Sequence, residues 1–170
     1  MRCRTVRSEI SMKWIISLLL CLSAACASAA QETKHFVRGS YQEIVSARAG
    51  KPFIIGFWSL TCTNCIDDLA MFGKLARKYR DLDLVLVATD TPEQKRELAH
   101  TLQRYRLERT ESWVFADGFV ERLRYEVDPQ WYGELPRTYF YDARGNAVAV
   151  SGKLERVQIE RWLRENKKPK

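Results

Sequence analysis

The feature that most constrains the fold of this chain is an apolar segment followed closely by two cysteines. Residues 51–58 read Lys-Pro-Phe-Ile-Ile-Gly-Phe-Trp, a continuous apolar run of the kind found in a strand buried on both faces. Cys62 and Cys65 come next, and after them apolar residues recur at three- and four-residue steps, which predicts a helix. The chain therefore places a Cys-x-x-Cys pair at a strand-to-helix junction.

The predicted helix after the cysteines has one apolar side. The apolar residues at helical spacing are Ile66, Leu69, Phe72, Ala76 and Tyr79. The charged residues at other positions are Asp67, Asp68, Lys74, Arg77 and Lys78. We therefore expect both aspartates to lie outside the apolar stripe of this helix.

Strand and helix patterns alternate along the rest of the chain and end in a hairpin. The predicted elements are a strand at 82–88, a helix from Thr91 to about Tyr105, a strand at 112–115, a helix at 119–125, strands at 137–141 and 147–151, and a helix at 154–163. Thr91 and Gln94 form a capping-box pattern, and Gly145 stands where the hairpin needs a positive φ. This order predicts an α/β fold, a central mixed sheet with helices on both faces.

Residues 1–29 have the pattern of a secretory signal peptide. A basic segment precedes an apolar run that starts at Trp14, and Ala27-Ser28-Ala29 is a small-residue cleavage site. The apolar run is shorter than the ~20 residues that a membrane-spanning helix needs. We therefore expect an exported, periplasmic protein in which residues 30–166 form one domain and residues 167–170 a disordered tail.

Two other fates of this N-terminal segment stay open. It can remain uncleaved as a membrane anchor, or it can carry a lipid on Cys26 after Ser23-Ala24-Ala25. A serine stands where a lipobox usually has leucine, which weakens the second alternative. Contact with a membrane is expected only if the N-terminus is anchored in one of these ways.

The net charge argues against a nucleic-acid partner. The full chain carries 28 basic and 21 acidic residues, a formal net charge of +7. Four of the basic residues and one acidic residue lie in residues 1–29, so the exported chain has 24 against 20, or +4. This modest excess is not accompanied by basic clusters interleaved with exposed aromatic residues, and export argues against nucleic acid independently. We expect the Arg-rich stretches to be solvated helix faces.

Cleavage would leave Cys62 and Cys65 as the only cysteines of the exported chain, because Cys3, Cys21 and Cys26 precede the cleavage site. Two cysteines three positions apart cannot join distant parts of a fold, so the pair indicates redox chemistry. At a helix N-terminus, Cys62 faces unpaired backbone N–H groups that favour a thiolate. Cys62 is therefore the candidate nucleophile and Cys65 the candidate resolving thiol.

Two aspartates near Cys62 affect this assignment, and two other interpretations of the cysteine pair stay open. Asp67 and Asp68 complement the helix dipole but oppose a nearby thiolate. One alternative is an inert short-loop disulfide. The other is a zinc site, which needs four ligands; His35 and His100 lie far apart in the sequence and lack the spacing of a zinc motif. We expect no metal.

The motifs at the cysteines and further downstream resemble those of a known family. Phe57-Trp58 with Cys62-x-x-Cys65, followed far downstream by Glu134-Leu135-Pro136-Arg137-Thr138 and by Asp142-Ala143-Arg144-Gly145, resembles the thioredoxin-like superfamily. Within it the chain looks most similar to the exported TlpA/ResA-like thiol-disulfide oxidoreductases, over residues 36–163. The resemblance implies the thioredoxin fold.

The resemblance also implies roles for residues near the cysteines. It implies a cis bond between Leu135 and Pro136, with Thr61, Leu135 and Pro136 in contact with the substrate. Glu134 matches an acidic residue that exchanges protons with the second cysteine, here Cys65. An ordinary trans proline at Pro136 and an exposed loop carboxylate at Glu134 stay open as alternatives.

The chain departs from the family pattern at several positions. Thr61 stands where a tryptophan is common, Gly56 where thioredoxins have a buried aspartate, and Thr63-Asn64 differs from the dipeptides of thioredoxins and of strong oxidants. These departures leave proton handling, the partner surface and the direction of exchange open. Three tryptophans are expected in the core or in a groove wall rather than at a cofactor: Trp58, Trp113 and Trp131.

The sequence thus predicts a periplasmic thiol-disulfide oxidoreductase without an organic cofactor. Its expected partners are protein disulfides or dithiols and a redox partner protein, and reduction is the favoured direction. Two alternatives from other classes remain, a thioredoxin-fold binding or assembly module whose disulfide is not turned over and a metallochaperone. The small number of metal ligands disfavours the metallochaperone.

Overall fold

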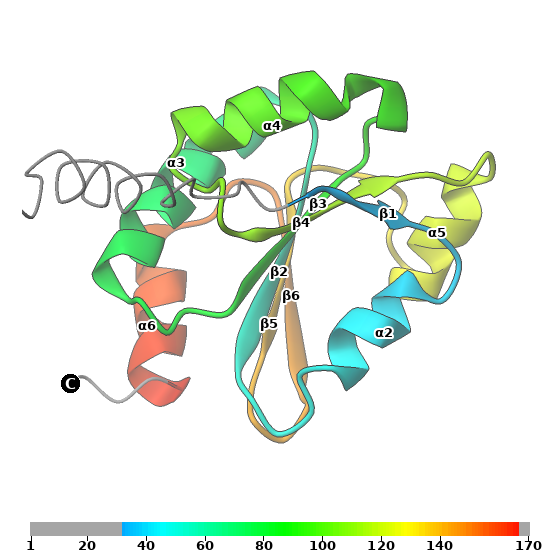
Figure 1. The fold of residues 1–170 in the computed structure, drawn as a ribbon. Helices are drawn as coiled ribbons and strands as arrows, with labels where there is room; N and C mark the ends of the chain where they lie inside the picture. Colours follow the sequence, from blue (N-terminus) through cyan, green and yellow to red (C-terminus); the bar gives the residue numbers. More distant parts are fainter. Residues whose placement is uncertain (1–31, 167–170) are drawn as a thin grey trace, which may run out of the picture. The chain divides into compact units, whose positions relative to one another are not determined.

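Six strands form one mixed sheet in the computed structural model, which describes residues 32–166. The strands are β1 (Lys34–Phe36), β2 (Phe53–Trp58), β3 (Leu84–Ala88), β4 (Glu111–Phe115), β5 (Arg137–Tyr141) and β6 (Ala147–Ser151). Their order across the sheet is β1-β4-β3-β2-β5-β6 (Figure 1). The four strands from β1 to β2 pair in parallel, whereas β5 is antiparallel to β2 and β6 is antiparallel to β5. The predicted mixed sheet is confirmed.

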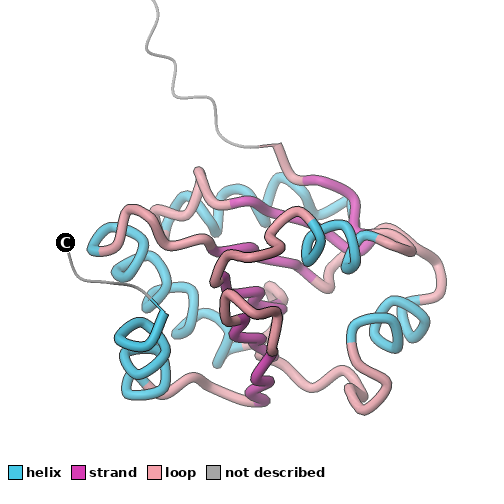
Figure 2. Tube along the Cα trace, turned by 90° about the horizontal axis from the view of Figure 1, so that it is seen from below, coloured by secondary structure: helices cyan, strands magenta, loops and turns pink. Residues whose placement is uncertain are grey.

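Helices cover both faces of this sheet (Figures 1 and 2). The helices are α2 (Ser40–Ser46), α3 (Thr63–Lys78), α4 (Lys95–Arg104), α5 (Val120–Val127) and α6 (Arg156–Asn166), with a 3-10 turn η1 (Pro92–Gln94) before α4. Apolar residues of α3, α4 and α6 pack in one cluster against one face of the sheet. Residues of α2 and α5 pack in a second cluster against the other face.

The two central strands are apolar because both of their faces are covered. All residues of β2 and β3 are buried, as their continuous apolar runs predict. β6 lies at the edge of the sheet, and its side chains are mostly exposed. The hairpin between β5 and β6 turns at Gly145, whose φ is +85°, as expected from its position.

Most predicted elements are present with small shifts at their ends. Thr91 and Gln94 do form a capping box, but the turn that they open is η1 rather than the first turn of α4. Two elements were not anticipated, β1 and α2, and Gly39 precedes α2 with a φ of +85°. Within residues 32–166 no helix is both long enough and apolar enough to span a membrane. The predicted signal peptide, the lipidation site at Cys26 and the predicted tail at 167–170 lie outside the described residues.

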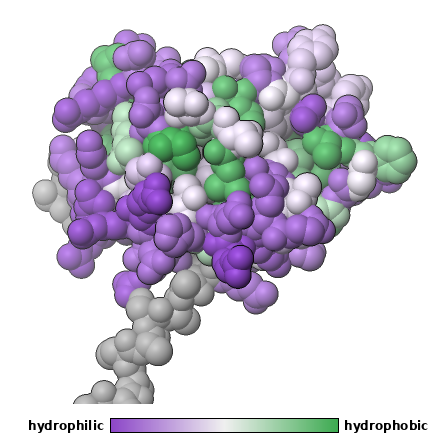
Figure 3. Space-filling view, turned by 90° about the horizontal axis from the view of Figure 1, so that it is seen from above, coloured by the Kyte–Doolittle hydropathy of each residue, from purple (hydrophilic) through white to green (hydrophobic). Residues whose placement is uncertain are grey.

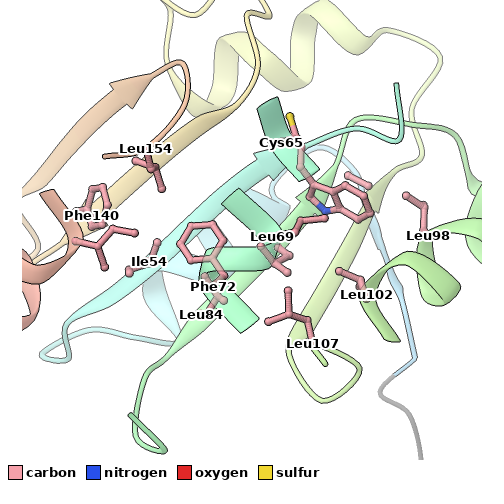
Figure 4. Packing of buried hydrophobic residues seen from close by; sticks show 14 of the residues in the cluster. Ile54, Cys65, Leu69, Phe72, Leu84, Leu98, Leu102, Leu107, Phe140 and Leu154 are labelled. Carbon is pink, nitrogen blue, oxygen red and sulfur yellow. The ribbon is translucent and has the colours of Figure 1, made fainter. Parts of the chain in front are cut away.

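Helix α3 differs from its predicted orientation at one position that matters. Its buried residues are Cys65, Asp68, Leu69, Phe72 and Gly73. Figure 4 shows Cys65, Leu69 and Phe72 on the side of α3 that meets the apolar cluster. The expectation that Asp68 lies outside the buried stripe is therefore wrong, because Asp68 is one turn after Cys65 on the same side of the helix.

Candidate active site

The two cysteines meet at the N-terminus of α3. Cys62 is the N-cap residue and is half-buried, whereas Cys65 is fully buried, with 0% of its surface exposed. Their sulfur atoms form a disulfide with an S–S distance of 2.07 Å. The backbone N–H of Cys65 donates a hydrogen bond of 3.2 Å to the Cys62 sulfur. The predicted strand-to-helix junction is thus observed, and Cys62 is the more exposed of the two cysteines.

Hydrogen bonds to Asp90 hold the loop that carries Cys62. The Ser59 hydroxyl donates to Asp90 Oδ1 at 3.0 Å, and the Leu60 N–H donates to Asp90 Oδ2 at 3.1 Å. Asp90 follows β3, and the Thr89 N–H donates to the Trp58 carbonyl at 2.9 Å. Because β2 and β3 are parallel and adjacent, their carboxyl ends fix the start of α3 together.

The downstream proline packs against the same helix end. The Leu135–Pro136 bond is cis, as expected. Pro136 is buried and lines a cavity of about 10 Å³ together with Cys65 and Asp68. Thr61 is exposed and Leu135 is half-buried. The structure therefore brings Pro136 beside Cys65, and it leaves Thr61 exposed to solvent.

Asp68 is an ionisable residue beside Cys65 whose burial its sequence pattern did not predict. Only 3% of its surface is exposed, and this burial raises its pKa to about 6, although the Leu154 hydrogen bond and the charge of Lys153 oppose the rise. The Leu154 N–H donates to Asp68 Oδ1 at 3.1 Å. Lys153 forms an ion pair of 2.6 Å with the exposed Asp67 and also favours the charged form of Asp68. A carboxyl group with a raised pKa thus lines the same cavity as the buried sulfur.

A signal for Asp68 was available in the sequence. Residues three positions apart on a helix share a face, so a buried Cys65 implies that residue 68 points to the same side. The sequence did not show which part of the chain buries this side of the helix. The segment between β6 and α6 does so, and the Leu154 N–H in that segment donates a hydrogen bond to Asp68.

Glu134 lies at the ends of β5 and β6. The Ser151 hydroxyl donates to its carboxylate at 2.9 Å, and Arg137 Nη1 donates at 3.5 Å. Its side chain is 44% exposed and is not among the groups lining the cavity beside Cys65. Partial burial works to raise the pKa of Glu134, but hydrogen bonds from its own backbone N–H and from Ser151 outweigh it and lower the pKa. Glu134 is therefore an ionised carboxylate at neutral pH.

Arg137 ties the proline segment to its surroundings. Its Nη2 pairs with Asp128 at 2.5 Å, and its Nη1 bonds Ser151 and Glu134. Trp131 donates a hydrogen bond of 2.9 Å to the Glu134 carbonyl from the same segment. The loop that presents Pro136 is thus held at both of its ends.

Trp58, Trp113 and Trp131 are all buried, as expected for core residues.

Figure 3 shows the molecule from the upper side of Figure 1. Hydrophobic residues lie at the centre and at the right edge of that view, among hydrophilic residues.

Comparison with known proteins supports the fold. No protein-family model matches the chain, and no curated protein does. A secreted Mycobacterium tuberculosis disulfide oxidoreductase homologous to E. coli DsbE is 19% identical, with a TM-score of 0.57, over 71% of this chain and 85% of its own.

Two further solved structures are similar to the same extent. The M. tuberculosis protein dsbF is 22% identical, with a TM-score of 0.57, over 71% of this chain and 84% of its own. A thioredoxin-family thiol:disulfide interchange protein from Chlorobium tepidum is 16% identical, with a TM-score of 0.55, over 71% and 83%. The chain therefore has the thioredoxin-like fold that the sequence predicts.

Proposed function

We propose that this protein is a thiol-disulfide oxidoreductase that exchanges disulfides with partner proteins through Cys62. The observation that carries the proposal is the pairing of an accessible Cys62 with a fully buried Cys65 at the N-terminus of α3, beside Pro136. A disulfide that only stabilises the fold has no need of this asymmetry. The similar structures are themselves disulfide oxidoreductases and a thiol:disulfide interchange protein, which supports the proposal.

The exchange reaction follows from the positions of the two sulfurs. In the reduced protein, the Cys62 thiolate attacks one sulfur of the partner's disulfide, forms a mixed disulfide and releases one partner thiolate. The Cys65 thiolate then attacks the Cys62 sulfur, restores the Cys62–Cys65 disulfide and releases the second partner thiolate. The partner gains two electrons, and the cysteine pair loses two. The Cys65 N–H, which donates to the Cys62 sulfur, favours the thiolate form of Cys62.

Asp68 is the group that we assign to proton transfer at Cys65. A buried thiol has to lose its proton before it can attack the mixed disulfide. With a pKa of about 6, Asp68 is largely ionised at pH 7 and can take up that proton. Asp68 and Cys65 line one cavity of about 10 Å³, a volume close to that of a single water probe, so a water between them can relay the proton. Glu134 is the second candidate for this role, on the resemblance alone.

The substrate surface comprises Thr61, Leu135 and Pro136. Thr61 directly precedes Cys62 and is exposed. Pro136 lines the cavity beside Cys65, and the half-buried Leu135 directly precedes it. The backbone of residue 135 pairs with an extended segment of the partner. Thr61 replaces a large aromatic residue, so it leaves more room beside Cys62 for the partner.

The proposal also covers where the protein is located and in which direction it exchanges disulfides. The signal-peptide pattern at 1–29 supports a periplasmic location, and one of the similar structures is described as secreted. The resemblance to TlpA/ResA-like proteins favours reduction of disulfides in that compartment. The electrons then come from a redox partner protein, with no organic cofactor.

Insulin reduction with dithiothreitol as the electron source tests the activity. We expect the wild-type protein to accelerate precipitation of the insulin chains and Cys62→Ser to abolish the acceleration. Cys65→Ser should retain attack by Cys62 and accumulate a mixed disulfide that dithiothreitol releases. Equal rates for wild type and Cys62→Ser would instead support the binding or assembly module with a disulfide that is not turned over.

A further inference from the structure

Arginine side chains from separate segments line an open groove at the end of the sheet away from the cysteines. The groove lies at the beginnings of β3 and β4, whereas the cysteines follow the end of β2, which runs parallel to β3. Its volume is about 860 Å³. The arginines that line it are Arg48, Arg77, Arg80, Arg106 and Arg109. The sequence suggested that such arginines lie on ordinary solvated helix faces. The structure instead brings these five together in one concave surface.

The two carboxylates in the groove are already neutralised. Arg48 Nε pairs with Asp83 at 2.9 Å, and Arg48 Nη2 pairs with Glu111 at 2.6 Å. The Arg48 side chain is only 11% exposed, so it forms part of the floor of the groove. Lys34 also pairs with Glu111 at 2.9 Å. Neither carboxylate is left to repel an anion.

The positive charge is local rather than a property of the whole domain. Of the 28 basic and 21 acidic residues, seven basic and one acidic lie outside residues 32–166, which leaves 21 against 20 and a net charge of +1. The groove alone has five arginines and two carboxylates in its lining, a net charge of +3. The C-terminal ends of α3 and α4 add about half a negative charge each, so roughly +2 remains.

Arg106 stands at a position where glycine is favoured. Its φ is +60°, in the left-handed region. Its N–H donates to the Gln103 carbonyl at 3.0 Å, and the Leu107 N–H donates to the Leu102 carbonyl at 2.8 Å. These bonds form a Schellman motif at the end of α4, in which glycine is the usual residue because it has no Cβ to strain the backbone. An arginine at this position carries a backbone strain that a glycine would avoid, and its side chain lines the groove.

The chemistry of the groove fits phosphate groups. Guanidinium groups bind phosphate oxygens through paired, charge-assisted hydrogen bonds. Arg77, Arg80 and Arg106 are exposed, and the two carboxylates in the lining, Asp83 and Glu111, pair with Arg48 rather than with any of these three. The volume of the groove is within the range of small-ligand sites. We propose that this groove binds a ligand that carries phosphate groups, either a free phosphorylated molecule or the headgroup of a lipid.

Calorimetric titration with inorganic pyrophosphate at low ionic strength tests the site. The wild-type protein should bind saturably at one site. Arg106→Gly should bind at least tenfold more weakly, while its melting temperature stays the same or rises, because glycine relieves the backbone at that position. This combination separates loss of the ligand from loss of the fold. Arg80→Gln, which leaves the Schellman motif intact, should also weaken binding at least tenfold.

Arg96→Gln is the matched control for charge. Arg96 is exposed in the first turn of α4, at the other end of β3, so its loss should leave pyrophosphate affinity unchanged. Absence of saturable binding by the wild type, or an equal loss in Arg96→Gln, would overturn the proposal.

The two sources of phosphate are separated with vesicles. Flotation with phosphatidylglycerol vesicles that fails for Arg106→Gly and for phosphatidylcholine vesicles would identify a lipid headgroup. Pyrophosphate binding without flotation would identify a free ligand.

Discussion

At the residue scale, the buried carboxylate of Asp68 lowers the stability of the fold but serves the proposed proton transfer. A carboxyl group in an apolar helix face is costly when it is charged, and this cost appears as the raised pKa of about 6. A leucine or asparagine at residue 68 would avoid that cost. In the proposed mechanism the aspartate has a use that offsets this cost, because it takes up the proton of Cys65, which lines the same cavity.

Asp68→Asn should therefore stabilise the protein at neutral pH. The folded protein holds a proton on Asp68 up to a pKa of about 6, whereas the unfolded chain releases it near the ordinary value of 3.8. The wild-type stability cost thus develops between about pH 4 and pH 6 and remains in full above pH 6. Asparagine retains an acceptor for the Leu154 N–H, so the gain at pH 7.5 should reach up to about 3 kcal/mol. Urea unfolding at pH 7.5 and pH 3.5 measures it, and an equal gain at both pH values would contradict the burial argument.

The same variant should slow catalysis, and Glu134→Gln is its matched comparison. If Asp68 takes the proton from Cys65, Asp68→Asn should lower the rate of insulin reduction by about 10²-fold or more, with the largest effect near pH 7. Glu134→Gln should change the rate little, because Glu134 faces Ser151 and Arg137. The pH dependence of the rate for the two variants decides between the carboxylates. A large effect of Glu134→Gln with none for Asp68→Asn would restore the role that the family resemblance implies.

At the element scale, α3 packs so closely on the end of α4 that one position admits only glycine. A Cβ atom built on Gly73 would lie 2.0 Å from the carbonyl oxygen of Tyr105, the C-cap residue of α4. A backbone atom cannot move aside as a flexible side chain can. This contact sets how closely α3 approaches the end of α4, two helices that contribute to the cluster containing Cys65.

Gly73→Ala should therefore destabilise the protein although alanine is the better helix former. The gain in helix propensity is about 1 kcal/mol, whereas overpacking against a fixed backbone costs about 3 kcal/mol, so a net loss of roughly 2 kcal/mol is expected. Denaturant unfolding measures the loss. Gly118→Ala is the control, because a Cβ there meets nothing within 4 Å, and its stability should stay within about 0.5 kcal/mol of wild type. Equal stability of Gly73→Ala and wild type would show that the two helices can separate freely.

At the scale of the whole molecule, stability should be greatest in the middle of the sheet. β2 and β3 are buried on both faces, each has a strand on both sides, and they separate the two apolar clusters. β6 pairs only with β5 and exposes most of its side chains. Local opening therefore costs least at β6 and most at the centre.

Native-state hydrogen exchange should reproduce this order. Amides of β2 and β3 should exchange only on global unfolding, whereas those of β6 should exchange by local opening with a lower free energy. The measurement is the denaturant dependence of exchange for each amide. Equal protection of β6 and β2 would mean that the hairpin unfolds only with the rest of the sheet.

Much of the architecture was predictable because it depends on local chemistry. The apolar run before Cys62 is typical of a strand buried on both faces, and the residues after Cys65 have the apolar spacing of a helix. The turn at Gly145 follows equally from its immediate neighbours. β1 was not predicted, because three residues give too little pattern and the strand depends on its pairing with β4.

Some features of the candidate site also follow from local sequence, whereas others depend on the tertiary structure. The sequence alone determined the cysteine pair, its place at a helix N-terminus and, through the family resemblance, the cis bond at Pro136, since each shows in a short stretch of residues. Only the tertiary structure decided that Asp68 is buried beside Cys65, because its cover comes from Leu154, 86 positions away. It also decided that Glu134 faces Ser151 and that arginines from separate segments share one groove. Burial and pairing depend on what other parts of the chain bring close, and local sequence patterns do not record those contacts.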